Sequence, residues 1–295
     1  MLRQVLRSLV GGFLMGTADL VPGVSGGTIA LVLGIYERLV ASIRQGSSAL
    51  GSMIKADFAG FRDHLENVEW RFFVPLLAGI LLAVVLLAGF LEHQLEERPE
   101  VISGLFFGLV LGSIGIAWRL LRVATWRHVV IAAVVGLVLF VALGFGEGEV
   151  REDPSTMAFF GAGALAICAM ILPGISGSLI LLMLGMYTPV LAAVTDREFG
   201  ILVVFALGAV VGLALFSQLL YWLLEHHHDN VLAALIGLMA GSMRILWPWP
   251  DGVGSAKLGT PESDGISVFV AMVVGAMIVT VISQLAVSRE SVASA

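Results

Sequence analysis

Two short interruptions in apolar sequence decide the fold of this chain: LVPGVSGGT at residues 20–28 and ILPGISGS at residues 171–178. Proline has no N–H to donate and glycine leaves the backbone loose, so each stretch is expected to interrupt a helix. Inside a membrane, such a break survives only where protein or a water-filled cavity satisfies the freed backbone groups. Two matched breaks in the two halves of a membrane chain point to the binding site of a transporter.

The composition supports a membrane protein. Of 295 residues, 58% are hydrophobic and only 13% are charged, with a mean hydropathy of +0.99, whereas soluble domains carry about 25% charged residues. We therefore predict an all-α polytopic membrane protein. The net charge of −6 comes without a long basic run, so no nucleic-acid partner is expected. Arg3 and Arg7 precede an apolar stretch, but no clear cleavage site follows, so we expect this segment to stay in the mature protein.

Uncharged apolar runs of about 20 residues predict six transmembrane helices. They are 72–91, 101–118 and 129–145 in the first half, and 200–224, 231–247 and 266–287 in the second. A break region precedes each set of three, at 8–43 and at 157–187.

The two halves also match beyond the breaks, which indicates an internal duplication into repeats 1–150 and 151–295. Around the breaks Pro22, Gly23, Ser25, Gly26, Gly34 and Tyr36 match Pro173, Gly174, Ser176, Gly177, Gly185 and Tyr187 without a gap. Further on, Gly79, Gly108 and Gly112 match Gly208, Gly237 and Gly241.

The first break region is long for one span and short for two, which predicts a re-entrant helical hairpin. For the second region, the alternative of two full transmembrane spans stays open. Either way each half crosses the membrane an odd number of times, so the second repeat is inverted relative to the first. With both termini cytoplasmic, the cytoplasmic side holds Arg3, Arg7, Arg44, Lys55, Arg62, Arg71, Arg119, Arg122, Arg127 and Arg289. The other side holds Arg98, Arg151, Arg197 and Lys257, a split that favours this topology slightly over one discontinuous span per break.

The breaks are suited to an anion. A helix that starts after Pro-Gly-x-Ser-Gly directs free N–H groups and the positive end of its dipole at the break, and such helix starts bind phosphate. The candidate phosphate-binding residues are Ser25, Gly26, Gly27, Thr28, Ser176, Gly177 and Ser178. The alternative is that the motif only allows tight helix packing, with serine bonded to the backbone.

Ionisable residues in or near hydrocarbon are costly and usually functional. Asp19, whose counterpart is Met170, is a candidate for proton or cation coupling, or else a helix cap. Glu37 and Arg38 are candidates for coupling or gating, or else an interfacial pair. Arg244 lies inside a predicted span and is the first choice as a phosphate partner, with Arg119 the second.

Metal and hydrolytic chemistry find little support. The tract 226–228 is three histidines, but it falls in a predicted loop without the spacing of metal ligands. No metal site and no cofactor are expected. Ser25 or Ser176 could act as a nucleophile only if a distant histidine approaches. The six tryptophans fall at predicted span ends, as interfacial anchors do.

MGTADLVPGVSGGT at residues 15–28, followed by LGIYE at residues 33–37, resembles the signature of the PopT-like polyprenyl-phosphate transporters, bacterial membrane proteins long catalogued as a domain of unknown function. The second motif of that family is similar to LPGISGS at residues 172–178 with GMY at residues 185–187. The resemblance covers essentially the whole chain.

This resemblance implies a transporter, not an enzyme, that returns undecaprenyl phosphate from the outer to the inner leaflet of the bacterial cytoplasmic membrane. The polar motif would take the phosphate while the lipid tail stays in the bilayer or in a side groove. Two alternatives stay open: a transporter of a small soluble anion, and a membrane lipid-phosphate phosphatase. The sequence leaves the coupling ion and the oligomeric state open.

Overall fold

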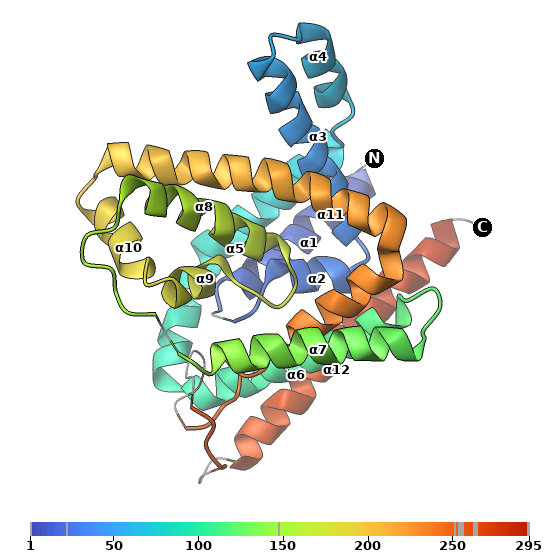
Figure 1. Cartoon of the computed structure of the whole chain (residues 1–295). Helices are drawn as coiled ribbons and strands as arrows, with labels where there is room; N and C mark the ends of the chain where they lie inside the picture. The colour runs from blue at the N-terminus through green and yellow to red at the C-terminus, as the bar shows by residue number, and fades with distance from the viewer. Residues whose placement is uncertain are drawn as a thin grey trace.

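The computed structural model describes residues 2–21, 23–146, 148–250, 252, 257–261 and 265–293, so Pro22 of the first break lies outside the described residues. The described part of the chain forms twelve helices and no strand (Figure 1). In chain order the helices are α1 (Leu2–Asp19), α2 (Gly26–Val32), α3 (Tyr36–Ile54), α4 (Phe58–Glu66), α5 (Trp70–Glu97), α6 (Pro99–Arg119), α7 (Trp126–Leu143), α8 (Thr156–Ile171), α9 (Gly177–Met183), α10 (Tyr187–Thr195), α11 (Phe199–Ser242) and α12 (Gly265–Ala293). The predicted all-α class is confirmed.

Among the described residues, five helices are long and apolar enough to cross a membrane: α5, α6, α7, α11 and α12. They cover the six predicted spans because α11 carries two of them. Its 44 residues correspond to about 66 Å, roughly twice the thickness of the hydrocarbon core. The short loop predicted between the spans 200–224 and 231–247 is reduced to a kink at His227, where φ of −136° and ψ of 38° are not helical and two helical segments of α11 meet (Figure 1).

Two predicted spans extend beyond the observed helices. α7 ends at Leu143, just before Gly144 and Gly146, the latter with φ +78°. α11 ends at Ser242, and Pro248 follows six residues later. Glycine and proline both oppose continuation of a helix, which explains the earlier ends.

Matched glycines bring two helix pairs into backbone contact. α1 packs on α5 through Gly12 and Gly79, and α8 packs on α11 through Gly163 and Gly208. A Cβ atom on any of the four would overlap a backbone carbonyl oxygen of the partner helix. Small residues allow this close approach inside membranes, where apolar surface alone does not drive helices together.

The remaining transmembrane helices pack in the same manner. α6 packs on α12 through Gly108 and Gly275, each directly against backbone of the other helix. α7 packs on the second half of α11 through Gly237 and Gly241. Gly108 and Gly237 are partners in the sequence match, so corresponding positions of the two halves serve corresponding helix contacts.

Each predicted break region contains a helix, a break and a second helix of seven residues. The first consists of α1, α2 and the beginning of α3, which runs on to Ile54 and leads into the projecting α4 (Figure 1). The second consists of α8 and α9, and α10 then leaves α9 at an angle of 111°. Gly23 and Gly174 take φ values of +83° and +87° at the two breaks, a conformation that costs other L-residues about 1–2 kcal/mol.

Candidate functional site

The two breaks touch each other. The hydroxyl group of Ser25 donates to the backbone carbonyl oxygen of Leu172 at 3.1 Å, and the backbone N–H of Gly174 donates to Thr28 Oγ1 at 3.1 Å. Gly27 packs against the second break so closely that a Cβ atom there would lie 2.7 Å from the carbonyl oxygen of Ile171. Residues about 146 positions apart are thereby joined into one small polar centre.

At the first break, side chains of the protein occupy the start of α2. Ser25 is its N-cap and accepts a hydrogen bond from the backbone N–H of Gly27 at 3.1 Å. Asp19, an exposed residue at the end of α1, accepts one from the backbone N–H of Gly26 at 2.6 Å. Ser25 and Thr28 are fully buried. Asp19 therefore acts here as the helix cap that the sequence offered as one of its two roles.

At the second break, no carboxylate occupies the corresponding position among the described residues. Ser176 is the N-cap of α9 and accepts from the backbone N–H of Leu179 at 3.2 Å. Its hydroxyl group also lies 3.1 Å from that of Ser178. Both serines are half-buried, while Gly177 is buried against Met170, the counterpart of Asp19. The second break is thus the more accessible of the two and the less negative.

The end of α11 and the turn that follows it pack against the two breaks. A Cβ atom on Gly23 would lie 2.9 Å from Ile245, and one on Gly174 would lie 2.7 Å from the Cα atom of Met239. Arg244 is the neighbour of Ile245 and is half-buried. Its guanidinium group lies over the ring of Phe140 in α7, at 4.8 Å from the ring centroid. Arg244 is therefore next to a residue that contacts the first break, but its side chain is directed toward α7.

The other predicted site residues lie away from the contact between the breaks. Arg119 is exposed at the end of α6. Arg38 forms an ion pair with Glu69 and lies over the ring of Phe72, 4.1 Å from the centroid. Glu37 accepts a hydrogen bond from His228 at 2.9 Å. These contacts tie the start of α3 to α5 and to the bend of α11.

The histidine tract lies at the kink of α11, where His226 and His227 are exposed and His228 is half-buried. His228 has both ring nitrogens 2.9 Å from carboxylate oxygens, one of Glu37 and one of Asp229. Within the described residues, no group of three histidine, cysteine, aspartate or glutamate side chains could hold a metal ion. Sequence analysis missed the role of this tract because the polar run resembles a loop and Glu37 is 191 positions away.

The fold and site together define a class: a multi-pass helical membrane protein in which two interrupted helices meet through their breaks. Residues 15–260 match a family described as undecaprenyl phosphate translocase-like. The chain is 40% identical over 249 residues to the polyprenyl-phosphate transporter of Vibrio cholerae, covering 83% of this chain and 79% of that protein. It is 32% identical over 260 residues to the polyprenyl-phosphate transporter of Staphylococcus aureus, covering 82% of this chain and 86% of that protein.

The chain therefore belongs to the undecaprenyl phosphate translocase-like family. The resemblance seen in the sequence is confirmed. Both relatives are named as transporters and neither as an enzyme, in agreement with the sequence prediction. No solved structure matches the chain.

Proposed function

We propose that this protein carries a polyprenyl phosphate across the bacterial cytoplasmic membrane, returning undecaprenyl phosphate from the outer to the inner leaflet for cell-envelope synthesis. The family and the names of the two relatives support the substrate class. The observation that carries the mechanism is the direct contact between the two breaks, through the bonds Ser25–Leu172 and Thr28–Gly174. It joins polar groups of both halves, which suits a site opened alternately to each side.

An inverted duplication of the two halves would allow this alternating access, and we infer one from the helix contacts. The helix pairs α1–α5 and α8–α11 use glycines at matched positions, and so do α6–α12 and α7–α11. The two breaks would then be re-entrant hairpins that enter the membrane from opposite sides. The start of α1 and the end of α12 lie toward the same side of Figure 1, which supports placing both termini on one side of the membrane. The excess of basic residues predicted for that side supports its assignment to the cytoplasm.

The phosphate would bind where the breaks meet. Its proposed ligands are Ser25, Gly26, Gly27 and Thr28 of the first break, Ser176, Gly177 and Ser178 of the second, and the cations Arg244 and Arg119. A phosphate at the first break competes with Asp19 for the backbone N–H of Gly26. Protonation of Asp19 would weaken this competition, because a neutral carboxyl group is a poorer acceptor than a carboxylate. This reasoning supports Asp19 as the site where transport couples to protons, with the contacts of Glu37 and Arg38 acting as a gate.

The alternatives differ in their chemistry. A phosphatase would need an activated serine, but Ser25 is 1% exposed and donates to a backbone carbonyl oxygen. The hydrogen bonds of Ser25 and Ser176 among the described residues involve no histidine. A transporter of a small soluble anion could use the same breaks and stays the second candidate.

Reconstitution separates the three functions. Vesicles containing the protein should move polyprenyl phosphate between leaflets without releasing inorganic phosphate. Release of inorganic phosphate would identify an enzyme instead. Uptake of water-soluble phosphate, with no movement of the lipid, would favour the soluble-anion transporter. Protein-free vesicles, and vesicles with heat-inactivated protein, measure the spontaneous rate.

A further inference from the structure

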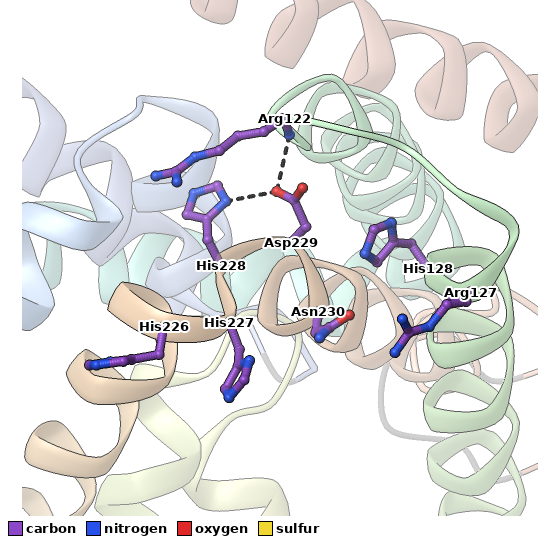
Figure 2. Close-up of a pocket in the computed structure, with 8 residues that line it drawn as sticks. All are labelled: Arg122, Arg127, His128, His226, His227, His228, Asp229 and Asn230. Carbon is purple, nitrogen blue, oxygen red and sulfur yellow. Dashed lines mark hydrogen bonds and ion pairs between the residues drawn. The ribbon is translucent and has the colours of Figure 1, made fainter.

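A second polar site lies at the bend of α11, apart from the breaks. A cavity of about 330 Å³ opens there between the bend, the start of α7 and the connection from α6 to α7. Its lining residues are Arg122, Arg127, His128, His226, His227, His228, Asp229 and Asn230 (Figure 2). Two arginines, four histidines and one carboxylate line this cavity.

That single carboxylate is already engaged. Asp229 accepts hydrogen bonds from the backbone N–H groups of Arg122 at 3.0 Å and Val123 at 3.1 Å. The ring of His228 lies 2.9 Å from its Oδ1 atom. In contrast, the guanidinium groups of Arg122 and Arg127 have no ion pair with any carboxylate of the described residues. The cavity therefore keeps a positive character.

Neutral hydrogen-bond donors lie beside the arginine side chains. His128 Nδ1 accepts a hydrogen bond from the backbone N–H of Thr125 at 3.2 Å, so the neutral ring carries its proton on Nε2. Figure 2 shows Arg127 extending from α7 toward Asn230 of α11, with His128 beside them. Guanidinium, imidazole and amide donors thus converge from two helices, a set suited to the oxygens of a phosphate group.

The tryptophans nearby indicate the depth of the cavity in the membrane. Trp126 begins α7 and is 74% exposed, and Trp222 lies one turn before the bend and is 48% exposed. Trp222 also stacks on His226, with ring centroids 4.9 Å apart. Exposed tryptophans gather at the level of lipid head groups, and basic pockets between transmembrane helices bind such head groups.

We propose that this cavity binds the phosphate monoester head group of a membrane lipid. A monoester carries about −1.5 to −2 charges at neutral pH and three strong acceptor oxygens. These match the two arginines of the lining and the neutral donors beside Arg127, while Arg122 extends beside His228 (Figure 2). Only the identity of the lipid as a polyprenyl phosphate rests on the proposed function. In that case, this cavity would hold the head group on the side of the membrane that carries both termini.

The test uses the full chain in nanodiscs of phosphatidylcholine and measures bound polyprenyl monophosphate by native mass spectrometry and titration. The variant Arg122→Gln/Arg127→Gln should bind one lipid fewer and lose affinity at this site about tenfold or more, because one charge-assisted hydrogen bond accounts for that factor. The matched control Arg3→Gln/Arg7→Gln removes two exposed arginines from the start of α1 and should bind as the wild type does. The variant Ser176→Ala/Ser178→Ala should keep this lipid, so failure of the break site and failure of this site are told apart.

Three results would overturn the proposal. The first is unchanged lipid binding in the double arginine variant with an unchanged melting temperature. The second is equal binding of phosphatidylglycerol, a phosphate diester, because the cavity would then attract any anionic lipid. The third is arginine-dependent binding of inorganic phosphate with no binding of the lipid, which would assign the cavity to a free anion.

Discussion

The hydroxyl group of Ser25 donates a hydrogen bond to the backbone carbonyl oxygen of Leu172 across 147 positions of sequence. A second bond, from the backbone N–H of Gly174 to Thr28 Oγ1, joins the same two breaks. Both bonds use backbone groups that the break in the second helix leaves without an intrahelical partner. Side chains of the first half therefore satisfy backbone polar groups of the second, as interrupted helices in a membrane require.

Replacing Thr28 by valine should destabilise the protein by about 1–3 kcal/mol, because the buried N–H of Gly174 would lose its acceptor. Thr17→Val is the matched control, since among the described residues Thr17 bonds only to the carbonyl oxygen of Phe13 in its own helix. Denaturant unfolding in detergent measures both. Equal losses in the two variants would contradict a special role for the bond between the breaks.

The serines of the two breaks should respond differently to alanine. Ser25→Ala removes a buried bond to Leu172 and the cap on Gly27, so it should cost about 1–3 kcal/mol of stability. Ser176→Ala/Ser178→Ala removes half-buried hydroxyl groups and should lower binding of polyprenyl phosphate with a smaller loss of stability. Melting temperature and lipid affinity, measured on the same preparations, separate these effects. Stable, fully binding Ser176→Ala/Ser178→Ala protein would exclude those hydroxyl groups as phosphate ligands.

Adding a side chain to the glycines at the helix contacts should destabilise the protein. Gly79→Ala and Gly208→Ala each force a Cβ atom into a backbone carbonyl oxygen of the partner helix, and such overpacking costs about 1–3 kcal/mol. Gly89→Ala in α5 and Gly200→Ala in α11 are the controls, because a Cβ atom there meets nothing within 4 Å. We expect the controls to keep or slightly raise the melting temperature, since alanine favours a helix over glycine by about 1 kcal/mol. A control that loses as much as Gly79→Ala would contradict the packing argument.

Arg244→Gln should weaken binding of polyprenyl phosphate about tenfold, the effect of one charge-assisted bond to phosphate. The side chain is half-buried and rests on Phe140, so glutamine retains part of the packing. Arg62→Gln is the control because Arg62 is exposed and, within the part of the chain that the structure describes, pairs only with Glu66 on its own helix. Unchanged affinity of Arg244→Gln for the lipid would remove Arg244 from the proposed site.

The spans and the breaks could be predicted because hydropathy, proline and glycine report on local structure. The loop predicted before residue 231 is a kink at His227 inside α11. Glu225 and His226–Asp229 form a polar run there, and a kink in a helix and a loop between helices produce the same polar run. Only the backbone angles at His227 distinguish them.

The contacts that define the site could not be predicted from sequence. Ser25 and Ser176 occupy matched positions, yet their hydroxyl groups differ in their hydrogen bonds. Ser25 bonds to Leu172 of the other half, whereas Ser176 bonds to Ser178 in its own break. This difference follows from how the breaks pack, which depends on glycine contacts such as Gly12 with α5. The asymmetry at Asp19 was visible in the sequence, because Met170 stands at the matched position, but its bond to Gly26 was not.

Asp19→Asn tests the coupling of transport. Asparagine can still accept the hydrogen bond from the backbone N–H of Gly26, so the fold and the binding of polyprenyl phosphate should be retained. It cannot take up a proton, so movement of polyprenyl phosphate between the leaflets of vesicles should no longer respond to an imposed pH gradient. The comparison is wild-type protein with and without the gradient, alongside the variant under both conditions. A preserved gradient response in Asp19→Asn would exclude Asp19 as the proton site, while loss of lipid binding would indicate that its charge positions the break itself.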